Sequence, residues 1–183
     1  MSKRPTGARS IMSKRPTGAR ITLKSIKYSE FASQETSCYE ARLCLDGKGV
    51  GVVSNQGGGG CDDQHFDSPE AEAEVQAHLK TLPQWVYEYE SDGKPVKLTG
   101  DTTLETVCGD ILNTWLASKD LKTLLRKKVL ALKDDGKLYT YKVIKPNKER
   151  VTRSAERVAK FENTVKVLNL LPFDEALKLY KEN

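Results

Sequence analysis

Residues 36–54 read TSCYEARLCLDGKGVGVVS, and this stretch decides the fold class. From Thr36 to Asp46 apolar and polar residues alternate, which is typical of a half-buried β-strand. One face of this strand holds Tyr39, Ala41, Leu43 and Leu45, and the other holds Cys38, Glu40, Arg42 and Cys44. Asp46-Gly47 predicts a tight turn, and Val50 to Ser54 supplies the returning strand. The stretch therefore predicts an antiparallel hairpin.

Further strands are indicated on both sides of this hairpin. Ile21 to Tyr28 predicts a third strand beside it. In the last third of the chain, Val129 to Lys133 and Leu138 to Ile144 flank Asp135-Gly136, which predicts a second hairpin. Thr164 to Asn169 predicts one more short strand.

Helical spacing of apolar residues predicts four to five helices between these strands. The first begins at Ser68-Pro69 and ends before Pro83, and the second has apolar residues from Leu104 to Leu116. Ser118 and Asp120 indicate a break before a short helix over 121–128. Two more are expected over Glu149 to Phe161 and from Pro172 onward, whereas Trp85 to Tyr89 fits a strand or a loop. The pattern predicts an α+β fold with a mostly antiparallel sheet built from hairpins and four to five helices packed on it.

The net charge of +5 is unevenly distributed along the chain. Residues 1–20 have six basic and no acidic side chains, and residues 1–9 recur unchanged at 12–20. An 11-residue doubling is too short for a solenoid repeat. We expect this duplicated basic leader to be an expression artefact or a disordered segment, with a native arm that contacts phosphate as the alternative.

The rest of the chain is divided by charge into two blocks. Residues 28–110 have 16 acidic and 5 basic side chains, a net charge of −11, and residues 111–183 have 9 acidic and 17 basic ones, a net charge of +8. We expect one domain over 21–183, with two possible subdomains: an acidic one over 21–118 and a basic one over 119–183. Such asymmetry concerns surfaces and partners, not the fold.

The strongest candidate for a binding surface is a basic face in the last third of the chain. Between Lys119 and Lys160 there are 14 basic and 5 acidic residues. Helical spacing places four of them on one helix face, and three lysines precede or open that helix; together they are Lys142, Lys145, Lys148, Arg150, Arg153, Arg157 and Lys160. Such a face binds phosphates or an acidic protein surface, or is simply solvated, with Glu149–Arg153 and Glu156–Lys160 as ion pairs within the helix.

A second candidate is the loop over 55–67, which contains Gly57 to Gly60 and precedes a helix. Its acids, Asp62, Asp63 and Asp67, form a possible acidic partner-binding loop. Together with His65 the same acids offer oxygen and imidazole ligands to a metal ion, although their spacing fits no standard motif. The alternative is that Asp67 and Ser68 cap the helix and the glycines form a turn.

The residues that catalysis and cofactors require are sparse. The chain has two histidines, and Cys61 lies beside two aspartates that disfavour a thiolate. We expect no enzymatic activity, no catalytic residues and no cofactor. The four cysteines suit a reducing cytoplasm, and no apolar run approaches the length that a membrane span needs.

Three segments resemble a group of small uncharacterised proteins of bacteriophages and other mobile elements. They are ITLKSIKYSEFASQETSCYEARLCLDGKGVGVVSNQGGGG, GDILNTWLASKDLKTLLRKKVLALKDDGKLY and NLLPFDEALKLYKEN. Relatives often have a His within the glycine-rich run, where this chain has only Gly57 to Gly60, which weakens the metal hypothesis. The resemblance implies a genetic context and no mechanism.

These observations lead to one expected function and two alternatives. We expect a cytoplasmic phage accessory protein that binds, and inhibits or redirects, a host protein or protein–nucleic-acid complex such as a nucleic-acid-handling defence system. One alternative is a protein that binds nucleic acid directly through residues 142–160. The other is a metal-binding protein or enzyme at the 57–67 loop.

Overall fold

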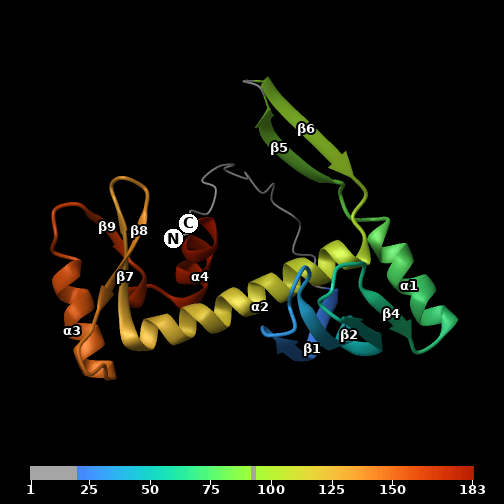
Figure 1. Ribbon diagram of the computed structural model, residues 1–183, viewed down its shortest axis with the longest axis horizontal. Helices are drawn as coiled ribbons and strands as arrows, with labels where there is room; N and C mark the ends of the chain where they lie inside the picture. The colour runs from blue at the N-terminus through green and yellow to red at the C-terminus, as the bar shows by residue number, and fades with distance from the viewer. Residues whose placement is uncertain (1–19, 92–93) are drawn as a thin grey trace. The chain divides into compact units, whose positions relative to one another are not determined.

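The computed structural model describes residues 20–91 and 94–183, which form antiparallel sheets and helices (Figure 1). The chain divides into two compact units, the first ending at Ile111 and the second spanning Leu112–Asn183. The boundary lies within helix α2 (Leu104–Lys127), and the division expected from charge, after residue 118, lies further along the same helix. The duplicated leader lies outside the described residues except for Arg20. The predicted α+β class with hairpin-built antiparallel sheet is confirmed.

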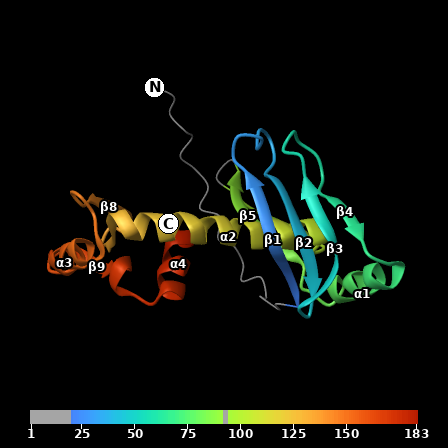
Figure 2. The ribbon, with the colours of Figure 1, turned by 90° about the horizontal axis from the view of Figure 1, so that it is seen from below.

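The first unit contains an antiparallel sheet in the order β1-β2-β3-β4 (Figure 2). Strands β1 (Ile21–Ser29), β2 (Cys38–Leu45) and β3 (Lys48–Asn55) are those that the sequence predicted. Tyr39, Ala41, Leu43 and Leu45 are all buried, so the alternation along β2 correctly identified the packed face. Cys44, expected on the opposite face, is buried as well.

The predicted loop over 55–67 was partly wrong, because it contains β4 (Asp63–Phe66). This strand pairs with β3, with Phe66 opposite Gly51 and Asp63 opposite Ser54. It is a short edge strand with three exposed polar residues, so it lacks the alternation by which sequence reveals a strand.

Helix α1 (Pro69–Leu79) follows β4 and begins where the sequence predicted. The Ser68 hydroxyl accepts a hydrogen bond from the amide of Ala71 at 3.2 Å, as an N-cap does. Val75 and Leu79 are buried on its inner stripe. The next segment forms a hairpin of its own, β5 (Trp85–Ser91) with β6 (Lys94–Gly100). Trp85 to Tyr89 is thus strand, and β6 was not predicted.

Helix α2 is continuous, which corrects the predicted break at Ser118 and Asp120. Leu121 is fully buried just beyond these residues, so the apolar stripe continues across them. A single Ser or Asp inside a helix costs only a fraction of a kcal/mol, roughly 0.5, and the burial of leucine outweighs that cost.

The second unit is a three-stranded antiparallel sheet in the order β8-β7-β9 with helices on both faces. Its strands are β7 (Lys128–Lys133), β8 (Leu138–Lys142) and β9 (Thr164–Val167). Val129 and Ala131 of β7 pack with α3 (Lys148–Val158), whereas Leu130 between them packs with the end of α2 and with α4 (Phe173–Glu182). This alternation places α3 alone on one face of the sheet.

Several boundaries in this unit differ from the prediction. β8 ends at Lys142, and the predicted strand over 164–169 becomes β9 followed by the 3-10 helix η1 (Leu168–Leu170). The helix predicted over Glu149 to Phe161 is α3, which ends at Val158, and Ala159 after it is exposed.

The Asn169 side chain joins three segments of this unit. Its Oδ1 atom accepts a hydrogen bond from the amide of Leu130 at 2.9 Å. Its Nδ2 atom donates to the carbonyl oxygens of Leu125 at 3.2 Å and Lys128 at 2.9 Å. This one side-chain amide therefore provides hydrogen-bond partners to backbone groups at the end of α2 and the start of β7, where the chain changes from helix to strand without a loop.

We predict that Asn169→Ala lowers the free energy of unfolding by about 1–3 kcal/mol, because it leaves one N–H and two carbonyl groups without this partner. Urea unfolding followed by circular dichroism measures the change. Asn113→Ala, at an exposed position on α2, is the matched control and is expected to be neutral or slightly stabilising. Equal stability of the two variants would contradict the role given to Asn169.

Candidate functional site

The candidate basic face is formed by α3 and the segment leading into it. The Asn147 side chain caps this helix by accepting a hydrogen bond from the amide of Arg150 at 2.8 Å. Val151, Ala155 and Val158 are buried against the sheet. Because these three residues fix which side of the helix faces inward, the remaining positions of α3 face solvent.

All seven predicted basic residues are exposed, and we call them the basic face. Arg150, Arg153 and Arg157 lie on α3, and Lys160 lies in the turn that follows it. The three lysines lie at the end of β8, in the connecting loop and at the first residue of α3: Lys142, Lys145 and Lys148. All seven side chains are thus accessible, and helical spacing places Arg150, Arg153 and Arg157 on the same side of α3.

The members of the basic face differ in their internal partners. Arg153 forms an ion pair with Glu149 at 2.9 Å, one of the two helix pairs expected. The Arg150 guanidinium donates to the carbonyl oxygens of Ile144 and Lys145, both at 3.4 Å, so it also holds the loop before α3. Among the described residues, no ion pair on α3 involves Arg157, which leaves its charge available to a partner.

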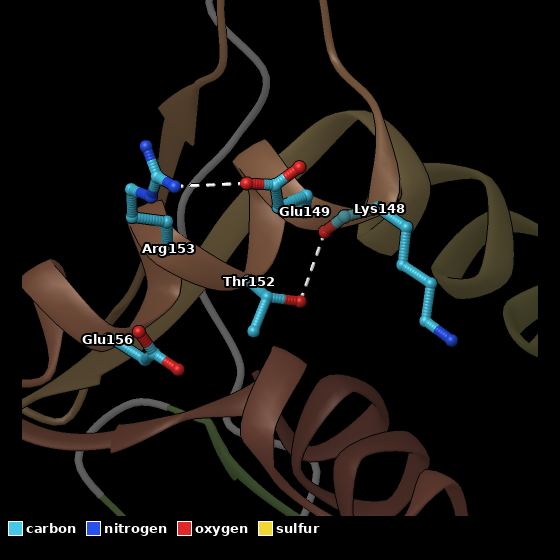
Figure 3. A pocket seen from close by; sticks show the side chains of 5 residues that line it. All are labelled: Lys148, Glu149, Thr152, Arg153 and Glu156. Atoms are coloured by element: carbon cyan, nitrogen blue, oxygen red, sulfur yellow. Dashed lines mark hydrogen bonds and ion pairs between the residues drawn. The ribbon is translucent and has the colours of Figure 1, made fainter.

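A shallow hollow of about 430 Å³ lies on the same helix and is lined by Lys148, Glu149, Thr152, Arg153 and Glu156 (Figure 3). Figure 3 shows Glu149 joined to Arg153, and the Thr152 hydroxyl donating to the carbonyl oxygen of Lys148 at 3.0 Å. Two acids and two bases line it, so this flank is nearly neutral. The positive charge is concentrated on the opposite flank, where Arg150 and Arg157 lie one above the other along the helix.

The acids of the second candidate are not gathered into one site. Asp62 accepts hydrogen bonds from the Tyr39 hydroxyl and, at 3.1 Å, from the Asn55 amide. Asp67 forms an ion pair with Arg42 through two hydrogen bonds. Asp63 and His65 are exposed on β4. Two of the three predicted acidic residues thus bond within their own unit, where the sequence had suggested a partner or a metal ion.

The structure contains no group of three or more His, Cys, Asp or Glu side chains that could hold a metal ion, among the residues it describes. The four cysteines are free thiols; Cys61 is exposed, and Cys44 and Cys108 are buried. Burial, together with the charges of Asp62 and Glu105, raises the pKa of Cys108 to about 12, so this thiol stays protonated.

The glycine-rich loop instead belongs to a hydrogen-bonded scaffold centred on Asn55, which is 7% exposed. Its Oδ1 atom accepts from the Thr36 hydroxyl at 2.6 Å and from the Gly57 amide at 2.9 Å. Its Nδ2 atom donates to the carbonyl oxygen of Gly60 at 3.2 Å and to Asp62. The Asn55 amide therefore makes as many hydrogen bonds as it has donors and acceptor sites.

The same scaffold fixes the connection between β1 and β2. The carbonyl oxygen of Gly57 accepts hydrogen bonds from three successive amides, those of Gln34, Glu35 and Thr36, at 3.0, 3.0 and 3.3 Å. Within this connection Phe31 is 98% exposed, a feature that the sequence did not predict. An isolated aromatic residue among Ser, Glu, Ala and Gln, between two strands, is the signal that could have identified it.

A group of exposed and partly buried aromatic residues, which we call the aromatic cluster, lies on the α3 side of the second sheet. It consists of Tyr139, Tyr141 and Phe161 together with Lys133. The rings of Tyr141 and Phe161 meet edge to face with centroids 6.1 Å apart, and Lys133 Nζ lies 4.5 Å from the centroid of Tyr139. Tyr139 is 39% and Phe161 47% exposed. The cluster is thus a partly apolar surface that has both a cation, Lys133, and an acid, Asp135, which accepts a hydrogen bond from the Tyr139 hydroxyl at 2.9 Å.

Comparison with known proteins gives no match: no family model, no curated protein and no solved structure is similar to this chain.

We predict that Gly57→Ala lowers the free energy of unfolding by more than about 1 kcal/mol. Gly57 has φ +86°, and an added Cβ would lie 2.1 Å from the carbonyl oxygen of Ala32. Gly58→Ala is the matched control, since its Cβ would meet nothing within 4 Å. Urea unfolding of both variants measures the difference, and equal destabilisation would show that the loop is not held at Gly57.

We also predict a loss of stability at alkaline pH. Burial, followed by the hydrogen bond to Asp62, raises the pKa of Tyr39 above its ordinary value of 10.0, so the folded state keeps the phenol protonated. Above pH 10 the unfolded state releases this proton and the folded state does not, so the free energy of unfolding falls by about 1.4 kcal/mol per pH unit for this group. The Cys108 thiol, whose ordinary pKa is 9.0, adds to this decrease in the free energy of unfolding above pH 9.

Tyr39→Phe isolates the contribution of this hydroxyl. We expect it to cost about 1 kcal/mol at pH 7 and to reduce the fall above pH 10. Urea unfolding at a series of pH values measures both effects. Tyr28→Phe, at the cross-strand neighbour of Tyr39, is the control and is expected to keep the wild-type pH dependence. An unchanged alkaline fall in Tyr39→Phe would refute the assignment.

Proposed function

We propose that this protein acts by binding and not by catalysis, and that its basic face engages an anionic surface of a host macromolecular complex. The observation that carries the proposal is the arrangement of α3, whose apolar side is buried while its arginines face solvent. We propose a complex that handles nucleic acid, such as a defence system, as the partner.

Because salt screens charges, nearby charged side chains, and not the net charge of the chain, determine the attraction to a partner. At physiological salt the Debye length is about 8 Å, so only charges on the same small surface act together on a partner. Arg150, Arg153 and Arg157 are three and four positions apart, and side chains at this spacing on a helix are neighbours. The basic face therefore attracts an anionic surface as a unit, mainly by accelerating association.

Two further considerations support a binding protein. The resemblance to small phage proteins is consistent with an accessory protein that acts on host machinery, in the cytoplasm of the host cell. None of the helices that the structure describes is long and apolar enough to cross a membrane. In the 57–67 loop, Asp62 bonds to Tyr39 and Asp67 to Arg42.

We predict that reversing two charges of the basic face, Arg153→Glu with Arg157→Glu, abolishes co-purification of the partner from a host lysate. The matched control is Lys80→Glu with Lys178→Glu, which changes the net charge equally at exposed helical or helix-end positions outside the basic face. Tagged proteins are compared after identical capture, and the bound proteins are identified by mass spectrometry.

Three outcomes of this experiment are informative. Loss of the partner in the basic-face variant alone supports the proposal. Equal capture by both variants contradicts it. Loss of all bound material after nuclease treatment, together with a steep decrease in affinity with salt, would instead show direct nucleic-acid binding by residues 142–160.

A further inference from the structure

We propose that copies of this chain associate head to tail, with Phe31 of one copy docked on the aromatic cluster of a second copy. The inference goes beyond the proposed function, because it concerns a different partner and rests on residues outside the basic face. It is carried by three observations: a fully exposed aromatic side chain on a fixed loop, an exposed aromatic cluster in the other unit, and the opposite charges of the two surroundings.

Phe31 is exposed because the loop that holds it is fixed. The amide of Ala32 donates to the Ser29 hydroxyl at 3.3 Å, and the Ser33 hydroxyl donates to the carbonyl oxygen of Ser29 at 2.7 Å while accepting from the amide of Cys38 at 2.8 Å. These bonds close the loop at its base, and the carbonyl oxygen of Gly57 fixes its second half.

A fixed loop with an exposed phenylalanine is suited to docking. The side chain is 98% exposed, so it gains nothing from packing in its own unit, while the backbone around it is already ordered. An ordered loop loses little conformational entropy on association, which is a main cost of binding. Aromatic side chains held in this way are typical of residues that dominate interface energies.

The charges around Phe31 select the partner. Glu30 and Glu35 belong to the same loop, both are exposed, and residues 28–110 have a net charge of −11. This surface repels nucleic acid and requires a basic protein surface with apolar area. The second unit of this chain provides one, since residues 111–183 have a net charge of +8 and the aromatic cluster is exposed there.

The aromatic cluster offers Phe31 exposed ring surface, and it offers the acids beside Phe31 two lysine side chains. Tyr139 and Phe161 each expose part of a ring, and offset or edge-to-face contacts between aromatic rings are favourable. Lys133 lies over Tyr139, and Lys160 precedes Phe161 in the chain, so two cations can meet Glu30 and Glu35. Two acids lie beside the same rings, since Asp135 accepts a hydrogen bond from the Tyr139 hydroxyl and Glu162 follows Phe161. The contact joins two different surfaces, so one copy in it keeps a free acceptor and the other a free donor.

The first test is the mass of the full chain in solution, measured by sedimentation velocity over a range of protein concentrations. We expect the mass to rise above the monomer value of 20.4 kDa with concentration and to fall again in about 1 M NaCl, where charges are screened beyond about 3 Å. Phe31→Ala is expected to weaken association by at least about 10-fold, as loss of a central aromatic contact does. Leu98→Ala, at another exposed apolar residue, is the control and should associate like the wild type.

The second test distinguishes a head-to-tail contact from a symmetric one. Phe31→Ala removes the donor, and Tyr139→Ala with Phe161→Ala removes the acceptor, so each variant alone is expected to remain monomeric. Mixed in equal amounts, they retain one intact donor and one intact acceptor, and we expect a discrete heterodimer of twice the monomer mass that does not grow further. Circular dichroism checks that each variant is folded.

Each remaining outcome overturns the proposal. A wild-type chain that stays monomeric at every concentration excludes a second copy as the partner of Phe31. A different basic protein would then be the partner of Phe31. Association that is unchanged in Phe31→Ala places the contact elsewhere. A mixture that stays monomeric while the wild type associates shows that the contact is symmetric. If the acceptor variant fails to fold, the comparison of Phe31→Ala with Leu98→Ala still decides.

Discussion

The four hydrogen bonds of the Asn55 side chain are the constraint on which the surface of the first unit depends. An amide group that is 7% exposed loses its contacts with water on folding, so each donor and acceptor must find a partner within the protein. Asn55 finds them in Thr36, Gly57, Gly60 and Asp62, which lie in two connections on either side of the β2–β3 hairpin. The loop of Phe31 and the glycine-rich loop are therefore held by one side chain, and neither can move without leaving a buried polar group unpaired.

What could be predicted from the sequence was local. The alternation along β2 and the amphipathic pattern of α3 follow from burial on one face, which repeats at a fixed period and needs no knowledge of the partner element. Helical spacing also groups Arg150, Arg153 and Arg157 on one side of α3 without knowledge of any partner element. Edge strand β4 and the continuity of α2 were missed because they depend on β3 and on the burial of Leu121.

The acids of the 57–67 loop show how residues that are close in sequence turn to different partners in the structure. Asp62, Asp63 and Asp67 lie within six residues, but the strand β4 separates them and Asp62 and Asp67 turn to different partners. Their partners Tyr39 and Arg42 lie 23 and 25 residues earlier in the chain, on β2, and no local pattern links such positions. The exposure of Phe31 was missed because aromatic residues are usually buried, and its polar neighbours between two strands were the sequence signal against burial.

The charged side chains of the two units differ in whether they have partners within the protein, and both proposals depend on this difference. In the first unit Asp46, Asp62 and Asp67 bond to Arg20, Tyr39 and Arg42, so part of its negative charge maintains the fold. In the second unit the arginines of α3 lie opposite the buried stripe, and only Arg153 among them has an ion-pair partner in the described part of the chain. Exposed charge without internal partners contributes little to stability and remains available for association. The basic unit is therefore where an anionic partner gains most, whereas the acidic unit needs an aromatic anchor, Phe31, to add affinity to its charge.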